Sequence, residues 1–130
     1  MPEPYRILLI DDDANYREAI RIRLTAEGFH ITSAGSGQEG LGACEQGAFD
    51  LILLDMLMPE QDGISTYQEL KANPTTNQIP VILLTGLAVE GHWEPMPYEA
   101  EGQVFIMGKP YDHTALVSRI HQLLRSRMAP

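Results

Sequence analysis

Cysteine, aromatic side chains and long apolar runs are all scarce in this sequence. Its one cysteine, Cys44, cannot form a disulfide within the chain, so nothing points to an oxidising compartment and we expect a cytoplasmic protein. The longest apolar runs reach only four or five residues, and no basic segment followed by a long apolar stretch opens the chain. The sequence therefore predicts neither an export signal nor a membrane span.

Basic residues are scarce as well. The 9 Lys and Arg residues face 18 Asp and Glu residues, which gives a formal net charge of −9. This balance disfavours direct binding to nucleic acid and favours cations or basic partners. The 44% hydrophobic and 21% charged content is that of an ordinary globular protein, and 130 residues predict one domain spanning 1–130.

Five short apolar runs predict five strands. The first, third and fourth runs are continuously apolar, which is typical of strands that helices cover on both faces. The five runs are Tyr5–Ile10, Phe29–Thr32, Phe49–Leu54, Val81–Leu84 and Val104–Met107.

Helical patterns separate these runs. An amphipathic segment covers Ala14–Glu27 and stops at Gly28, and Ser36–Glu39 is a capping-box pattern that opens a second helix. The second helix contains several glycines and has poor intrinsic propensity, so packing must stabilise it. Two further apolar stripes predict a third helix and a last one: Ile64, Tyr67 and Leu70 before Asn73-Pro74, and Leu116, Val117, Ile120, Leu123 and Leu124.

Strand and helix thus alternate along the chain. Crossovers long enough for a helix predict an α/β fold in which a parallel sheet carries helices on both faces. The pattern alone does not give the order of the strands.

Polar residues stand where four of the five predicted strands end. Asp11–Asp13 follow the first strand, Asp55 the third, Thr85-Gly86 the fourth and Lys109-Pro110 the fifth. The carboxyl ends of parallel strands meet at one edge of a sheet, which is where such folds bind ligands. We therefore expect these residues to lie together.

This set of residues suits phosphoryl transfer. Clustered carboxylates raise each other's pKa unless a cation neutralises them, and oxygen ligands suit Mg²⁺. Lys109 and Thr85 offer a positive charge and a hydroxyl donor to phosphoryl oxygens. Asp55 can act as the nucleophile that forms an acyl phosphate, and Gly86 leaves room for the group.

The sequence resembles the receiver domains of two-component response regulators over essentially its whole length. Four segments carry the resemblance: Ile7–Asp13, Asp50–Pro59 with Asp62-Gly63, Pro80–Gly86, and Lys109-Pro110. The resemblance implies a flavodoxin-like doubly wound sheet of five strands in the order 2-1-3-4-5.

The resemblance also implies roles for single residues. Asp55 would be the phospho-acceptor, Asp12 a direct Mg²⁺ ligand and Asp11 a second acidic group acting directly or through water. The backbone carbonyl of Leu57 would complete the metal shell. Thr85 and Lys109 would bind phosphoryl oxygens, and movement of Thr85 would be the switch.

The implied partners are a phosphohistidine donor and a downstream effector. The donor would be a sensor histidine kinase or a histidine phosphotransfer protein. The resemblance implies that the chain is not an enzyme and that it catalyses only its own phosphoryl transfer and dephosphorylation. Neither nucleic acid nor a membrane is an expected direct partner, and a homodimer is left open.

The sequence departs from the family pattern in two places. In the family an aromatic residue usually lies three positions before the lysine, and its rotamer often changes when the threonine moves. Here Ile106 stands at that position, with Phe105 beside it, so the resemblance does not extend to this rotamer change. Pro95 and Pro97 would each cost about 3 kcal/mol inside a helix, so we expect a short or irregular fourth helix between residues 87 and 103. The aromatic residues of this segment either form a surface that binds a partner protein or fold back to cover the sheet.

Two apolar residues, Leu57 and Leu87, lie two positions after Asp55 and Thr85. Neither can orient an attacking water, so our hypothesis is slow hydrolysis of the acyl phosphate.

Several other interpretations remain open. The three aspartates after the first strand could serve only as a helix cap. Asp11 could be the nucleophile of a phosphatase or phosphotransferase like the haloacid dehalogenases, or the fold could be a binding module that is never phosphorylated. Cys44 reads as a half-buried helix residue, and the four histidines show no metal-ligand spacing.

Overall fold

Strands and helices alternate from β1 to β4 in the computed structural model, which describes residues 4–55, 63–85, 104–108 and 113–128. The five strands form one parallel sheet in the order β2-β1-β3-β4-β5. The strands are β1 (Arg6–Ile10), β2 (His30–Ala34), β3 (Leu51–Asp55), β4 (Val81–Thr85) and β5 (Val104–Gly108). The helices are α1 (Ala14–Ala26), α2 (Gly37–Gln46), α3 (Gly63–Ala72) and α4 (His113–Met128).

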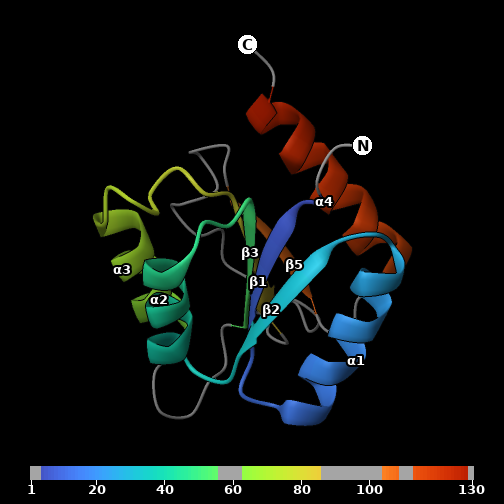
Figure 1. Cartoon of the computed structure of the whole chain (residues 1–130), viewed down its shortest axis with the longest axis horizontal. Coiled ribbons are helices and arrows are strands. Elements are labelled where there is room, and N and C mark those ends of the chain that lie inside the picture. The colour runs from blue at the N-terminus through green and yellow to red at the C-terminus, as the bar shows by residue number, and fades with distance from the viewer. Residues whose placement is uncertain (1–3, 56–62, 86–103, 109–112, 129–130) are drawn as a thin grey trace.

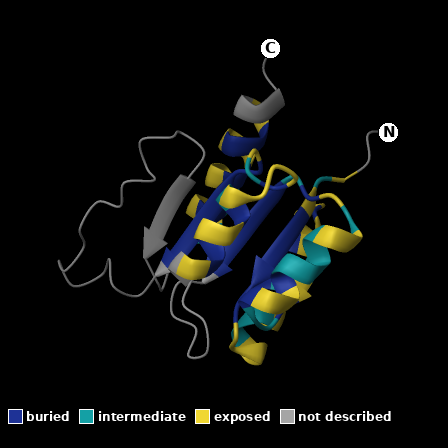
Figure 2. Cartoon of the chain, turned by 90° about the vertical axis from the view of Figure 1, so that its left-hand side faces the viewer, coloured by how far each residue is buried: buried dark blue, intermediate teal, exposed yellow. Residues whose placement is uncertain are grey.

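Helices cover the sheet on both faces, with α2 and α3 on one side and α1 and α4 on the other (Figure 1). Successive side chains of a strand point to opposite faces, so each central strand contributes to two cores. Leu8, for example, packs into the core under α2 and α3, whereas Leu9 packs into the core under α1 and α4. Figure 2 shows the buried strands between helices whose outer surfaces are exposed.

The burial of the strands explains their sequence. All four residues from Ile7 to Ile10, from Leu51 to Leu54 and from Val81 to Leu84 are at most 1% exposed. A strand covered on both faces has no polar side, so these runs do not alternate. The doubly wound α/β fold and its strand order, predicted from the sequence, are confirmed.

Helix α1 begins and ends where the sequence predicts. The Asp13 carboxylate accepts hydrogen bonds from the backbone N–H groups of Asn15 and Tyr16, at 3.0 and 3.1 Å, and so caps the helix. After the helix, Gly28 adopts a positive φ of 98°, which a residue with a side chain rarely adopts. Ile20 and Leu24 are the buried residues of α1.

Helix α2 begins at the predicted capping box. The Ser36 hydroxyl oxygen accepts a hydrogen bond from the Glu39 N–H at 3.1 Å. The Glu39 carboxylate reaches back one residue further than in the usual box and accepts from the Gly35 N–H at 2.6 Å. Gly37 and Gly40 are its buried residues, so the glycines that weaken the helix also line its inner face.

Element ends differ from the prediction by one or two residues. The second strand was predicted over Phe29–Thr32, whereas β2 covers His30–Ala34. Asp55 and Thr85 are the last residues of β3 and β4 rather than the first residues after them. The predicted short or irregular fourth helix lies outside the described residues. No helix within the described residues is long and apolar enough to span a membrane.

Candidate functional site at the carboxyl edge of the sheet

The three aspartates after β1 have three different surroundings. Asp11 is fully buried, whereas Asp12 and Asp13 are exposed. Asp13 caps α1, so the interpretation of these residues as a helix cap is correct for Asp13. The carboxylates of Asp11 and Asp12 do not take part in that cap.

Asp11 is fixed by backbone and side-chain hydrogen bonds. Its N–H donates to the carbonyl oxygen of Ala34 at 3.1 Å, which continues the ladder between β1 and β2. Its carboxylate oxygen Oδ1 accepts from the Asp13 N–H at 3.0 Å. Its carbonyl oxygen accepts from Nη1 of Arg17 at 2.7 Å. A buried carboxylate oriented in this way is suited to a fixed binding site and poorly placed for attack on an outside substrate.

Sequence reasoning missed Arg17. Its guanidinium is half-buried at the turn that carries the acidic residues. A basic residue at the fourth position of a helix that follows an acidic strand end was the signal that could have identified it.

The strand register brings Asp55 beside Asp11. Ile10 pairs with Leu54 in the ladder between β1 and β3, so the next residues of the two strands are Asp11 and Asp55. Asp55 in turn pairs with Leu84, which places Thr85 one residue further along β4. The carboxyl ends of β1 and β3 lie at the lower edge of the sheet in Figure 1. The backbone thus brings three of the four predicted strand ends together.

The fifth strand reaches the same edge. Thr85 pairs with Gly108 in the ladder between β4 and β5, and Lys109 is the next residue of the chain. Lys109 itself lies outside the described residues, as do Leu57, Gly86, Leu87 and the segment with Pro95 and Pro97.

The donor atoms at this edge fit a hard divalent cation. Carboxylate oxygens, with Asp11 already oriented and Asp12 exposed beside it, are the ligands that Mg²⁺ prefers. Among the described residues, which leave out the Asp55 side chain, no three His, Cys, Asp or Glu side chains gather as a metal site.

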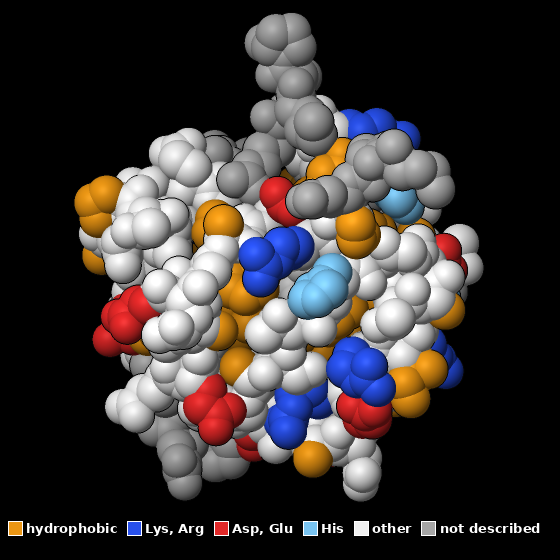
Figure 3. Space-filling view, in the orientation of Figure 1, with side chains coloured by type: hydrophobic (Ala, Val, Ile, Leu, Met, Phe, Trp, Pro, Cys, Tyr) orange, Lys and Arg blue, Asp and Glu red, His pale blue; other side chains and the backbone are white. Residues whose placement is uncertain are grey.

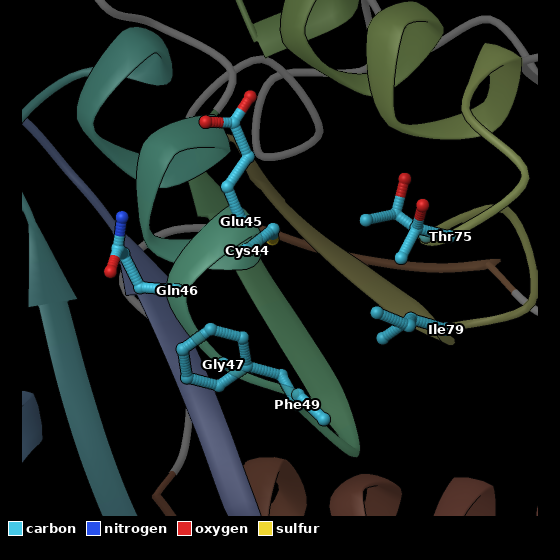
Figure 4. A pocket seen from close by; sticks show the side chains of 9 residues that line it. Cys44, Glu45, Gln46, Gly47, Phe49, Thr75 and Ile79 are labelled. Carbon is cyan, nitrogen blue, oxygen red and sulfur yellow. The ribbon is translucent and has the colours of Figure 1, made fainter.

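A cavity of about 310 Å³ lies at the opposite end of the sheet (Figure 4). It is lined by the end of α2 and by residues that precede β3 and β4, including Cys44, Phe49, Thr75 and Ile79. Burial raises the pKa of the Cys44 thiol above its usual value. A half-buried thiol with a raised pKa is a poor nucleophile, in agreement with the interpretation of Cys44 as a helix residue.

The described histidines lie away from the acidic edge. The Nε2 atom of His113 lies 3.4 Å from Oε1 of Glu27, and the ring of His121 packs against Phe29 at 5.3 Å between centroids. His30 is exposed on β2. None of these described histidines lies in a cluster that could hold a metal, in agreement with the absence of metal-ligand spacing in the sequence.

Comparison with known proteins identifies the family. Residues 7–121 match the response regulator receiver domain. The chain is 36% identical over 124 residues to the response regulator PleD of Caulobacter vibrioides, and the match covers 95% of this chain and 27% of PleD. The chain therefore spans about a quarter of that relative's length.

Solved receiver structures superpose closely on this fold. The signal receiver domain of a signal transduction histidine kinase from Syntrophus aciditrophicus matches with a TM-score of 0.80 and 27% identity, covering 97% of this chain and 94% of that one. The receiver domain of a sensor histidine kinase from Pseudomonas aeruginosa, which has a magnesium ion coordinated in its active site cleft, matches with a TM-score of 0.78 and 23% identity, covering 94% and 98%. The chain belongs to the response regulator receiver domains of two-component signalling.

Proposed function

We propose that the chain accepts a phosphoryl group on Asp55 in a reaction that requires Mg²⁺. The observation that carries this proposal is the register of β1, β3 and β4, which sets Asp55 between Asp11 and the end of β4 that carries Thr85. Family membership supports the same assignment. The buried, oriented carboxylate of Asp11 argues against the alternative in which Asp11 is the nucleophile.

In the proposed step, one carboxylate oxygen of Asp55 forms a bond to phosphorus. The bond between phosphorus and the donor's imidazole nitrogen breaks, and its electron pair stays on the imidazole. Thr85 and Lys109 donate hydrogen bonds to the phosphoryl oxygens. Hydrolysis later returns Asp55 to its carboxylate form, so the chain turns over no external substrate other than its phosphodonor.

The metal would be held by the carboxylates of Asp11, Asp12 and Asp55 and by the carbonyl of Leu57. When bound, Mg²⁺ offsets negative charge on the carboxylates and the phosphoryl oxygens. The magnesium ion in the Pseudomonas receiver domain supports this assignment by family likeness. Asp11 and Asp12 are the members of this set whose surroundings the structure describes.

The proposed partners are a sensor histidine kinase or a histidine phosphotransfer protein as donor, and an effector that reads the phosphorylated surface. A cytoplasmic location is part of the proposal. Direct binding to nucleic acid is not part of it, because 18 acidic residues against 9 basic ones give the chain a formal net charge of −9. On the face seen in Figure 3, basic and acidic side chains are mixed. Among the described residues of that face, neither sign forms a continuous patch.

The proposal is tested by incubating the protein with Mg²⁺ and a small acyl-phosphate donor. We expect one phosphoryl group per chain, sensitive to hydroxylamine as an acyl phosphate is, and located on Asp55 by peptide mapping. Asp55→Asn should abolish the labelling, and chelation of Mg²⁺ should prevent it. Asp50→Asn, a matched loss of a carboxylate at the other end of β3, should leave labelling unchanged.

Other outcomes have definite meanings. Labelling on Asp11 would identify a phosphatase-like nucleophile and contradict the proposal. No labelling by either the small donor or a phosphorylated histidine protein would identify a receiver fold that serves only as a binding module.

A further inference from the structure

The side chain of Arg17 connects α1 to the end of β1. Its Nη1 atom donates a hydrogen bond of 2.7 Å to the carbonyl oxygen of Asp11, in a half-buried setting. A guanidinium donor makes this bond stronger than one between neutral groups. Arg17 thus binds the backbone between the two acidic residues of the site, Asp11 and Asp12.

Gly35 provides the space that the Arg17 side chain occupies. A Cβ atom at Gly35 would lie 3.2 Å from Nη1 of Arg17 and 3.3 Å from Oε2 of Glu39, which is tighter than ordinary contact. The Glu39 carboxylate also accepts a hydrogen bond from the Gly35 N–H. A cation and an anion therefore flank Gly35, and the Arg17 side chain, bonded to the turn after β1, lies close to the turn after β2.

The bonded carbonyl controls the orientation of both acidic residues. It belongs to the planar peptide that joins Asp11 to Asp12, so fixing its direction also fixes the backbone at which Asp12 begins. The N–H of Asp11 is already bound to Ala34, and its carboxylate to the Asp13 N–H. Arg17 holds the remaining backbone group of Asp11.

We propose that Arg17 is a positioning residue of the magnesium site. It fixes the Asp11–Asp12 peptide so that both carboxylates are oriented before the cation arrives. This inference rests on the proposed function, because it assumes that Asp11 and Asp12 hold Mg²⁺. Groups that orient metal ligands typically change metal affinity by about 10- to 100-fold when they are removed.

Two effects of Arg17 on metal affinity have opposite signs. Its positive charge repels Mg²⁺, so a role through charge alone would make affinity rise when Arg17 is removed. Its hydrogen bond orients the ligands, so a positioning role would make affinity fall. The direction of the change therefore separates the two roles.

The test compares Arg17→Met, Arg17→Lys and Arg23→Met with the unchanged protein by calorimetric titration with Mg²⁺, at a temperature where circular dichroism shows each variant folded. Arg23 is an exposed residue of the same helix, so its variant matches the loss of charge. We expect the Kd for Mg²⁺ to rise about tenfold in Arg17→Met and less than twofold in Arg23→Met. Arg17→Lys should recover part of the affinity, because an ammonium can still donate to the carbonyl.

A second readout needs no metal. Hydrogen exchange of the Asp13 amide, whose N–H binds the Asp11 carboxylate, should accelerate in metal-free Arg17→Met relative to Arg23→Met. Unchanged or tighter Mg²⁺ binding in Arg17→Met overturns the inference. If that variant does not fold, Arg17→Gln, which removes the charge and shortens the side chain, takes its place, and unchanged Mg²⁺ binding together with unchanged Asp13 exchange in Arg17→Gln overturns the inference. Absence of Mg²⁺ binding by the unchanged protein overturns the proposed function, and the positioning role with it.

Discussion

Helices α1 and α2 pack against opposite faces of β1, and the residues that each buries there differ in size. Both begin with a capping side chain, Asp13 in α1 and Ser36 in α2. Helix α1 then buries large apolar residues, Ile20 and Leu24, whereas the buried residues of α2 are glycines. Helix α1 is stabilised by large side chains that it inserts into the core, whereas α2 approaches the sheet closely at its glycines and adds the partly buried side chains of Leu41, Ala43 and Cys44.

The glycines of α2 do not share one role. A Cβ atom on Gly40 would lie 2.3 Å from Cδ1 and 2.7 Å from Cγ1 of Ile10, both too short for real contacts. A Cβ atom on Gly42 would meet nothing within 4 Å. Gly40 is therefore required by packing against β1, whereas Gly42 only weakens the helix.

The largest effect is expected for α1. Leu24→Ala removes a fully buried side chain from the core under α1 and α4 and should lower the free energy of unfolding by about 2–5 kcal/mol. Urea denaturation followed by circular dichroism measures it. Ile22→Ala is the matched control, because Ile22 is 56% exposed on the same helix and its loss should change stability by less than about 0.5 kcal/mol. Equal effects of the two variants would contradict the comparison.

An intermediate loss is expected for Gly40→Ala. Overpacking against Ile10 typically costs about 1–3 kcal/mol, and the better helix propensity of alanine recovers up to about 1 kcal/mol, so we expect a net loss of about 1–2 kcal/mol. The same denaturation experiment measures it.

The source of that loss can be checked with a second substitution. Ile10→Val removes the Cδ1 atom that a Cβ at position 40 would meet. In the double variant the two substitutions should therefore cost less than the sum of their separate costs. Strict additivity would show that the clash is not the cause.

The smallest effect, and the only gain, is expected for Gly42→Ala. The substitution is chemically the same as at position 40, in the same helix, but the added methyl group enters open space. Stability should rise by up to about 1 kcal/mol. A loss of stability at both positions would mean that α2 tolerates no side chain along this stretch, and the distinction between the two glycines would be lost.

The core and the element order could be predicted from the sequence because both depend on local patterns. Continuous apolar runs such as Leu51–Leu54 indicated doubly covered strands, and the capping box at Ser36 located the start of α2. The extent of β2 could not be predicted. Ser33 and Ala34 carry no apolar strand signal, and they are in the strand because they pair with Leu9 and Ile10.

The sequence predicted which residue types gather at the site, but it predicted their surroundings only in part. The strand-end rule correctly brought Asp11 and Asp55 to neighbouring positions. The cap at Asp13 is local, but the burial of Asp11, which distinguishes it from the exposed Asp12, depends on contacts with other elements. The same holds for Arg17, whose position depends on a glycine that follows another strand.

The shared register of β1, β3 and β4 also bears on when the protein becomes competent to signal. Asp11 and Asp55 are far apart in the sequence and become neighbours only after those strands have paired. A nascent or partly unfolded chain would have its aspartates dispersed and would offer a kinase no target. Under the proposed function, receipt of a phosphoryl group would report that these three strands have paired, so that only molecules with a formed sheet centre would be phosphorylated.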